Sequence, residues 1–457
     1  MKKLNFYLLI AVFSSIIIGW VLFSDKSEAR NEPSLKADAN YREAKQVADS
    51  PAALPETADN EPVAVVKKAS ALKKAASVSI RSHEVADSDT DEVSLKDKLL
   101  QKGVYFGTAL NPADIQLRAP RPKNYLDEIS RYFNFYTISV TFKTTENQRG
   151  VFTFQAADKM VEFALAHHSK IKGHVLAWGD ALPDWVTQGN YSPGELKSIL
   201  QNHVQTIVKH FKDKYPGAVT EWNVVNEPVC NDAAFNNQTD CYPEGVKKFV
   251  WSAIHKPGST DPTDYIQYAF EWAHAIDPSA KLFLNENNIE TSGNPPKLGR
   301  LYNLVKSLKQ KGVPINGIGF ESHIRLFDLN KFNAQTLTKT MNMFADLGLE
   351  TQISEFDAVM ASGLTNTRPA GLIPITNPTA NDFKNQAKLY RIFLTACLHA
   401  KNCTGFTTWG VWDNTSWTST YWKGSFYPHL LDANFKPKLS FKSLMDEAKS
   451  YKTEKAF

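Results

Sequence analysis

The chain lacks an excess of charge of either sign. Its 52 lysine and arginine side chains are nearly balanced by 48 aspartates and glutamates. Nucleic-acid binding normally needs a strong basic face, so we expect no nucleic-acid partner. Histidines at metal-binding spacing are also lacking, because no two of them stand at helical or strand spacing beside a carboxylate, and His167 and His168 are adjacent. The sequence therefore argues against a metal-dependent hydrolase, and no metal ligands are expected.

Cysteine is scarce, with four residues in the whole chain. Cys230 lies close to Cys241 in the sequence, and Cys397 lies close to Cys403. Two local disulfides are the simplest of the three pairings, and free buried thiols are the alternative. Pairing requires an oxidising compartment, so the choice depends on where the chain resides.

Long apolar runs are lacking except at the N-terminus. Lys2 and Lys3 precede an uncharged, mainly apolar run from Leu4 to Phe23. Such a run is typical of an export signal, and it is also long enough to span a bilayer. Residues 27–29 (SEA) offer a small-x-small cleavage site. We therefore expect residues 1–29 to be a signal peptide or a membrane anchor formed by residues 4–23, and the protein to be exported: periplasmic, secreted, or anchored facing outward.

Residues 30–94 lack almost all aromatic side chains and are rich in Ala, Lys, Glu, Asp, Ser and Pro. Such a stretch buries too little apolar surface to offset the entropy lost on ordering. We predict a disordered spacer ahead of a catalytic domain over residues 95–450. One or two small helices around Leu72 to Ala76 are the alternative.

From residue 95 onward, apolar and β-branched runs alternate with amphipathic stretches of helical length, such as Ser192 to Tyr215 and Lys297 to Gly312. The alternation favours an α/β fold, a closed (β/α)8 TIM barrel with parallel strands. A doubly wound open sheet is the alternative, but no glycine-rich phosphate loop follows the first run. The eight predicted strands are Val104–Leu110, Phe133–Thr141, Lys170–Trp178, Val219–Glu227, Lys281–Asn288, Gly317–Ile324, Glu350–Asp357 and Gly405–Asp413.

Polar residues gather at the ends of these runs, where such a barrel carries its active site. Carboxylates stand at Glu227, Glu286, Glu321 and Glu355. Four buried carboxylates would repel one another, so a purely structural role for the set is unexpected. Glycoside hydrolysis needs one protonated and one ionised carboxyl group. Glu227 and Glu355, at the ends of the fourth and seventh strands, could supply them.

Seven short motifs then appear in a fixed order. Residues 222–228 (WNVVNEP) and 353–357 (ISEFD) resemble the acid/base and nucleophile motifs of glycoside hydrolase family 10, the endo-1,4-β-xylanase family. The likeness extends over most of residues 103–449. The other five motifs are YFGT (105–108), GHVLAW (173–178), LPDW (182–185), GFESH (319–323) and WGVWDNTSW (409–417).

The resemblance implies a role for individual residues. It implies a retaining endo-xylanase that cleaves xylan through a covalent glycosyl-enzyme intermediate, with Glu227 as acid/base and Glu355 as nucleophile. His323 would hold Glu355, Asp357 would orient His323, and Asn226 would bind the sugar hydroxyl beside the reacting carbon. A disulfide between Cys397 and Cys403 fits many members of the family. No cofactor is implied, and the expected partner is a polysaccharide or an oligosaccharide. Further substrate-binding candidates are Trp178, Trp185, Asn285, Glu321, Trp409 and Trp417.

The sequence departs from the family pattern in the sugar-binding shell. A Glu-Asn pair and a Lys are usual near the end of the second strand, where this chain has Thr137, Ile138 and Thr141, with Lys143 nearby. Gly179 follows Trp178 where His is usual, and Glu321 stands where Gln is usual. These changes concern the substrate more than the reaction. Hydrolysis of another β-linked glycan or glycoside, and glycan binding without turnover, therefore stay as alternatives. Insertions over 230–241 and 361–379 are expected to shape the groove or to be disordered.

Overall fold

The computed structural model describes residues 93–116, 121–232, 236, 240–290, 296–366 and 371–451. The expected signal or anchor over residues 1–29 lies outside the described residues. So does the predicted spacer up to residue 92, with its alternative of small helices. Among the residues that are described, no helix has both the length and the apolar character needed to cross a membrane.

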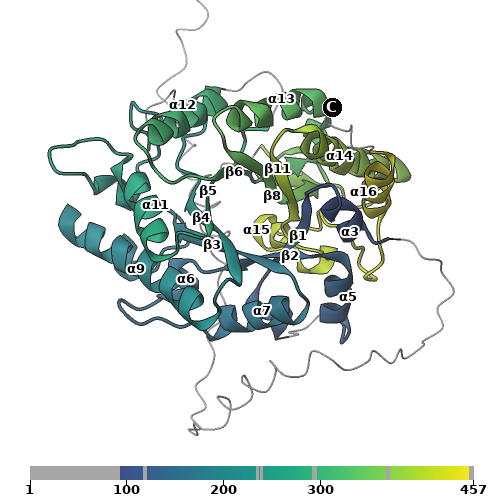
Figure 1. The fold of residues 1–457 in the computed structure, drawn as a ribbon. Helices are drawn as coiled ribbons and strands as arrows, with labels where there is room; N and C mark the ends of the chain where they lie inside the picture. Colours follow the sequence, from purple (N-terminus) through teal and green to yellow (C-terminus); the bar gives the residue numbers. More distant parts are fainter. Residues whose placement is uncertain are drawn as a thin grey trace, which may run out of the picture.

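Eight parallel strands close into a barrel, as the alternating pattern predicts (Figure 1). The ring closes because β11 pairs with both β1 and β8. The open-sheet alternative is therefore wrong. In ring order the strands are β1 (Tyr105–Leu110), β2 (Phe135–Ser139), β3 (Lys170–Ala177), β4 (Val219–Asn226), β5 (Lys281–Glu286), β6 (Gly317–Phe320), β8 (Glu350–Val359) and β11 (Cys403–Thr408).

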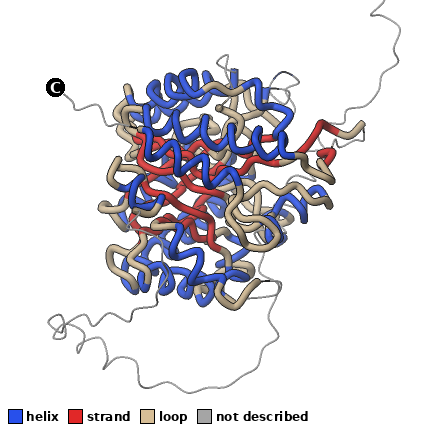
Figure 2. Tube along the Cα trace, turned by 90° about the vertical axis from the view of Figure 1, so that its right-hand side faces the viewer, coloured by secondary structure: helices blue, strands red, loops and turns tan. Residues whose placement is uncertain are grey.

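The strands are buried on both faces, which explains why their sequences read as nearly continuous apolar runs. Every residue of β3 after Lys170 is buried, and β4 has one partly exposed position. Helices cover the outside of the barrel, and side chains fill its inside. Figure 2 shows the strands enclosed between helices in the side view.

Helices follow most strands, and some of them begin at a side-chain cap. The side chain of Ser192 accepts from the backbone N–H of Glu195, and Glu195 bonds back to Ser192, so α9 begins with a capping box. The helices are α3 (Leu95–Leu100), α4 (Pro112–Ile115), α5 (Tyr125–Tyr132), α6 (Phe142–Thr145), α7 (Gln155–Ala166), α8 (Asp184–Thr187), α9 (Pro193–Lys214), η1 (Val250–Ala253), α11 (Asp264–Ile276), α12 (Pro296–Gln310), η2 (Leu326–Lys331), α13 (Ala334–Ala345), α14 (Ala380–His399), η3 (Asp413–Thr415), α15 (Trp417–Trp422) and α16 (Leu439–Ser450).

The sixth predicted strand differs from the structure because it is broken in two. β6 ends at Phe320, and β7 (His323–Arg325) pairs with the extended end of β8. Between them Ser322 has φ +65°, a left-handed conformation that no strand contains. The break turns the chain at the active-site end of the barrel and sets Glu321 and His323 on either side of the turn. Farther along, the 361–379 insertion contains a hairpin of β9 (Ala361–Leu364) and β10 (Leu372–Pro374).

Candidate active site

The two carboxylates chosen from the sequence lie at the same end of the barrel. Glu227 follows the last residue of β4, and Glu355 lies within β8, two residues before Asp357, where β7 begins to pair. Glu227 is 1% exposed and Glu355 is fully buried. A short chain of bonds links them, because the Glu227 N–H donates to the Asn285 carbonyl over 2.9 Å and Asn285 Nδ2 donates to Glu355 Oε1 over 2.7 Å.

Glu227 adopts a left-handed backbone conformation, with φ +49°. A non-glycine residue pays a conformational cost there, and such residues concentrate at functional sites. Its carboxylate Oε2 lies 3.1 Å from Nζ of Lys247. Although burial lowers the pKa of Lys247, the carboxylates of Glu227, Glu286 and Asp180 outweigh it and raise that pKa. The ammonium group is therefore charged beside Glu227.

Glu355 accepts hydrogen bonds at both carboxylate oxygens. Oε1 accepts from Asn285 and lies 3.7 Å from Nδ1 of His174. Oε2 lies 3.2 Å from Nε2 of His323. A buried carboxylate that is held at both oxygens is fixed in orientation, as a nucleophile must be.

His323 bridges two carboxylates. Its Nδ1 lies 3.0 Å from Oδ2 of Asp357, and that same oxygen accepts from the indole N–H of Trp417 over 2.8 Å. Burial lowers the pKa of His323, but Asp357 and Glu355 more than reverse this and raise the pKa to about 10. The ring is therefore an imidazolium at neutral pH, and it donates to Asp357 on one side and to Glu355 on the other. These are the contacts that the sequence led us to expect of His323 and Asp357.

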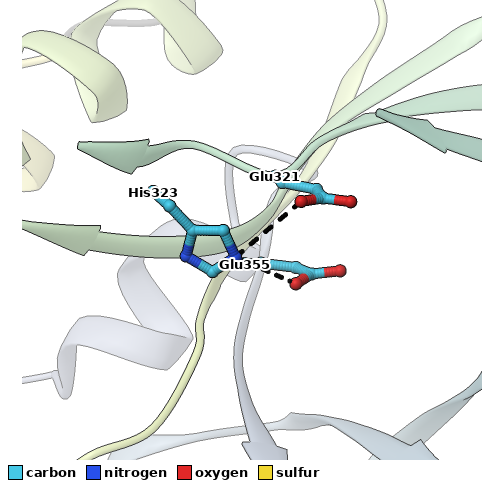
Figure 3. Close-up of side chains that lie close together, drawn as sticks. All are labelled: Glu321, His323 and Glu355. Carbon is cyan, nitrogen blue, oxygen red and sulfur yellow. Dashed lines mark hydrogen bonds and ion pairs between the residues drawn. The ribbon is translucent and has the colours of Figure 1, made fainter. Parts of the chain in front are cut away.

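Glu321 adds another buried carboxylate beside Glu355 and His323. It is fully buried, its Oε1 accepts from Nδ2 of Asn285 over 3.2 Å, and its Oε2 lies 3.8 Å from Nε2 of His323 (Figure 3). Glu321, His323 and Glu355 are the one group of possible metal ligands in the described part of the chain whose donor atoms all lie within 4.8 Å of one another. However, an imidazolium has no free lone pair on Nε2. A metal ion could bind here only by displacing the proton on Nε2 of His323.

Asn226 and Asn285 form a buried pair beneath the carboxylates. Nδ2 of Asn285 donates to Oδ1 of Asn226 over 2.9 Å, and both residues are fully buried. Nδ2 of Asn226 has no hydrogen-bond partner among the described residues. A buried donor without a partner is costly, so it is expected to bind something that enters the site. Asn285, which was predicted to bind substrate, bonds to Asn226 and to the carboxylates Glu321 and Glu355.

The four candidate tryptophans differ in how close they lie to the carboxylate cluster and in how exposed they are. Trp409 packs edge-on against His174 at 5.1 Å and His323 at 6.4 Å, and Trp417 packs against His323 at 5.1 Å. Trp409 is the partly exposed member of this pair. Trp178 is only 3% exposed, and partly exposed Trp185 donates from its indole N–H to the carbonyl of Glu146 over 3.3 Å. Of these indoles, Trp409 and Trp417 lie directly beside the carboxylate cluster.

The structure shows where the residues that depart from the family pattern lie. Thr137, Ile138 and Thr141 are buried, so these short side chains add no charge at the end of β2. Gly179 leaves space that another residue occupies: a Cβ built on it would lie 1.9 Å from Cδ1 of Phe249. Phe249 comes from the chain that follows the 230–241 insertion. That segment therefore fills the place beside Trp178.

Both predicted local disulfides are present. Cys230 is bonded to Cys241, and Cys397 is bonded to Cys403. No cysteine of the described residues is free. The free-thiol alternative is therefore wrong. The first bridge closes the insertion that follows β4, and the second lies between α14 and β11.

Two site residues were missed from the sequence. Lys247 follows the insertion, and nothing in the local pattern indicates that its side chain returns to Glu227. His174 lies in the motif at 173–178, but the sequence indicates no role for it. It is 1% exposed, and its Nδ1 lies 3.0 Å from Nδ2 of Asn223 and 3.7 Å from Glu355. Its position near the middle of a buried strand was the available signal, because a buried histidine needs a polar partner.

Comparison with known proteins gives a consistent result. The sequence profile described as glycosyl hydrolase family 10 matches residues 94–447. The chain is 32% identical over 333 residues to endo-1,4-beta-xylanase B of Thermotoga neapolitana, which spans 72% of this chain and 85% of that relative. It is 34% identical over 342 residues to endo-1,4-beta-xylanase C of Phanerodontia chrysosporium, which spans 75% of each. The solved structure of xylanase 10B from Thermotoga petrophila RKU-1 in complex with xylobiose is similar, with a TM-score of 0.67 and 29% identity over 79% of this chain and 99% of that chain.

Proposed function

Because this chain belongs to glycosyl hydrolase family 10, we propose that it is a retaining endo-1,4-β-xylanase in which Glu355 is the nucleophile and Glu227 the acid/base. The observation that carries the proposal is the placement of Glu227, directly after β4, and of Glu355, within β8, at one end of the barrel and linked through Asn285. Two buried carboxylates at one barrel mouth, in different surroundings, are the arrangement that glycoside hydrolysis requires.

Glu355 has the surroundings of a nucleophile. The imidazolium of His323 and the amide of Asn285 both donate to its carboxylate, which favours the ionised form. Its oxygen would attack the anomeric carbon while the glycosidic bond to the leaving sugar breaks, giving a covalent glycosyl-enzyme. Water would then attack the same carbon and release Glu355 as a carboxylate.

Glu227 would act on the other side of the bond. It would donate a proton to the leaving oxygen in the first step and take a proton from water in the second. Nδ2 of Asn226, the buried donor without a partner in the described chain, is suited to a sugar hydroxyl next to the reacting carbon. A hydrogen bond there strengthens as charge develops on the ring.

The relatives support xylan as the substrate. Both curated relatives are named as endo-1,4-beta-xylanases, and the solved neighbour holds xylobiose. The changes at Thr137, Ile138 and Thr141 leave Glu227 and Glu355 in place and supply no charged group. We therefore expect the reaction to be kept and the affinity for sugars on the non-reducing side to differ from that of the relatives.

The test is reducing-sugar release by the purified full-length protein from xylan, mixed-linkage β-glucan, cellulose and mannan. The Glu355→Gln and Glu227→Ala variants serve as matched controls. Release from xylan that is lost in Glu355→Gln is expected, and proton NMR of the first products should show the β-anomer, since retention passes through two inversions. If no reducing sugar is released from xylan but some is released from another polymer, that polymer would be the substrate. Silence on all four, with tight oligosaccharide binding, would indicate a binding protein.

We also propose that the protein is exported. The apolar run from Leu4 to Phe23 and the two disulfides support this, because stable disulfides form in oxidising compartments. Fractionation of the producing cells, with detection by antibody, should find the protein outside the cytoplasm. A purely cytoplasmic protein with reduced cysteines would overturn this part of the proposal.

A further inference from the structure

The segment that follows β4 returns to the catalytic carboxylates. After Glu227 and Pro228 the chain passes through the loop closed by the Cys230–Cys241 disulfide. It then runs back beside itself, because Val229 pairs with Val246 and Cys241 pairs with Lys247 in antiparallel bridges. Lys247 therefore lies next to Pro228, the residue that follows Glu227. Along the sequence, Lys247 is 20 positions after Glu227.

The backbone of Lys247 is held on two sides. Its N–H donates to the carbonyl of Pro228 over 2.8 Å, and its carbonyl accepts from the hydroxyl of Ser252 over 3.0 Å. Arg300 on α12 braces the loop itself, donating from Nη2 to the Cys230 carbonyl over 2.9 Å and to Asp232 over 2.6 Å. The position of Lys247 is thus fixed by a covalent loop and by a neighbouring helix.

The space around this segment is provided by its neighbours. Gly179 has no side chain, and Phe249 fills the volume that one would take. Nζ of Lys247 lies 5.5 Å from the Phe249 ring and 3.1 Å from Glu227, and its side chain is 14% exposed. A glycine after β3 and a long insertion after β4 therefore act together to bring one ammonium group to one carboxylate.

The other charges around this pair are largely matched. Glu286 at the end of β5 also faces Lys247, but it forms its own ion pair with Lys297 of α12 at 2.7 Å. Asp180 after β3 is the remaining carboxylate that faces Lys247. Asn285 connects this part of the site to the cluster of Glu321, His323 and Glu355. Glu227 contacts the ammonium group at ion-pair distance.

We propose that Lys247 is a positioning residue for Glu227, which holds the carboxylate in place and sets the upper pH limit of hydrolysis. This rests on the proposed role of Glu227 as acid/base. An ammonium group at this distance favours the ionised form of a carboxyl group, and an opposite charge within 4–6 Å typically changes the titration midpoint by about 1 to 3 pH units. General-acid catalysis needs the protonated form, so Lys247 restricts the first step to lower pH and favours base catalysis in the second.

The experiment measures kcat/KM against pH for the full-length protein on xylotetraose. Lys247→Met keeps the length of the side chain and removes its charge, so the alkaline limb should move upward by about 1 to 3 pH units. Lys247→Arg should return the limb toward that of the wild type. Lys248→Met, at the exposed neighbouring position, is the matched control and should leave the limb unchanged. With a 2,4-dinitrophenyl xylobioside, whose leaving group needs no proton, kcat/KM should fall little at alkaline pH in any variant.

The inference is overturned when the wild type hydrolyses xylotetraose and Lys247→Met shows an unmoved alkaline limb, whatever its kcat. An inactive wild type would instead defeat the proposed function. In that event the role of Lys247 can still be tested by titrating the carboxyl group of Glu227. The titration is followed by ¹³C NMR of glutamate-labelled protein, and the Glu227 signal is assigned with the Glu227→Gln variant. The same titration midpoint in wild type and Lys247→Met would defeat the inference, and an upward change of about one unit or more would support it.

Discussion

Ser354 donates a hydrogen bond from its hydroxyl group to the amide oxygen of Asn285 over 2.6 Å. Since that oxygen is occupied, the amide nitrogen of Asn285 is directed to Glu355, to which it donates over 2.7 Å. The orientation of the proposed nucleophile thus depends on the residue that precedes it in β8. The amide of Asn285 also reaches Asn226 and Glu321, so a small movement of Asn285 disturbs the whole cluster.

Gly319→Ala should impair catalysis by displacing Asn285. A Cβ at this position would lie 1.9 Å from Oδ1 of Asn285 and 2.9 Å from Oγ of Ser354. A hydrogen bond to a charged group contributes about 1.5 to 3 kcal/mol, so kcat/KM on xylan should fall roughly 10- to 100-fold. Gly299→Ala is the control, because nothing lies within 4 Å of a Cβ there and alanine favours a helix. Full activity in Gly319→Ala would show that Asn285 does not orient Glu355.

Glu321→Gln should extend activity to lower pH. Glu321 and Glu355 are both fully buried and share the Asn285 donor, so their negative charges oppose each other. Removing the charge of Glu321 makes ionisation of Glu355 easier, and the acidic limb of kcat/KM should move downward by about one pH unit. Glu350→Gln, which breaks a surface ion pair with Lys281 at the start of β8, should leave the limb in place. An acidic limb that moves upward, or not at all, would mean that His323 already offsets both charges.

The stability contribution of His323 should disappear in alkaline solution. Its pKa is raised to about 10 in the folded protein, chiefly by Asp357 and Glu355 against the opposing effect of burial. The unfolded chain loses this proton near pH 6.5, so the contribution is fully present below pH 6.5 and is lost as pH rises toward 10. We expect the difference in free energy of unfolding between wild type and His323→Gln to shrink by up to about 1.4 kcal/mol per pH unit over this range. Denaturant unfolding at several pH values measures it, and a constant difference would contradict the imidazolium assignment.

The two disulfides should differ in function while resembling each other in stability. They close loops of similar size, with sequence separations of 11 and 6. Replacing either pair by serine should cost about 2 to 3 kcal/mol, measured by denaturant unfolding. The variant without Cys230 and Cys241 should also have its alkaline limb at higher pH, because the segment that carries Lys247 pairs with Cys241 at the end of that loop. The variant without Cys397 and Cys403 should keep the wild-type pH profile. A raised limb in both variants would point to general loosening of the barrel.

The barrel and its carboxylates could be predicted from the sequence because their signals are local. A strand buried on both faces reads as an apolar run, and the polar residues after such a run identify its active-site end. Glu227 ends one predicted run and Glu355 lies near the end of another, so their placement required only the order of the strands. The local spacing of the cysteines predicted both disulfides for the same reason, since a bridge over a short separation needs no knowledge of the rest of the fold.

What only the tertiary structure decided are contacts between residues far apart in the sequence and a turn that interrupts an apolar run. The positive φ of Ser322 breaks the sixth run, and no composition signal marks it. Asn285 meets Glu355 across 70 positions, and their contact exists because β5 and β8 end at the same side of a closed barrel. Lys247 reaches Glu227 because a disulfide loop folds back and Gly179 leaves room for Phe249. The sequence by itself determined which residues form strands and where chemistry gathers; the closure of the ring and the return of the loop decided which charges face each carboxylate, because electrostatic interactions depend on distance in space and not on distance along the chain.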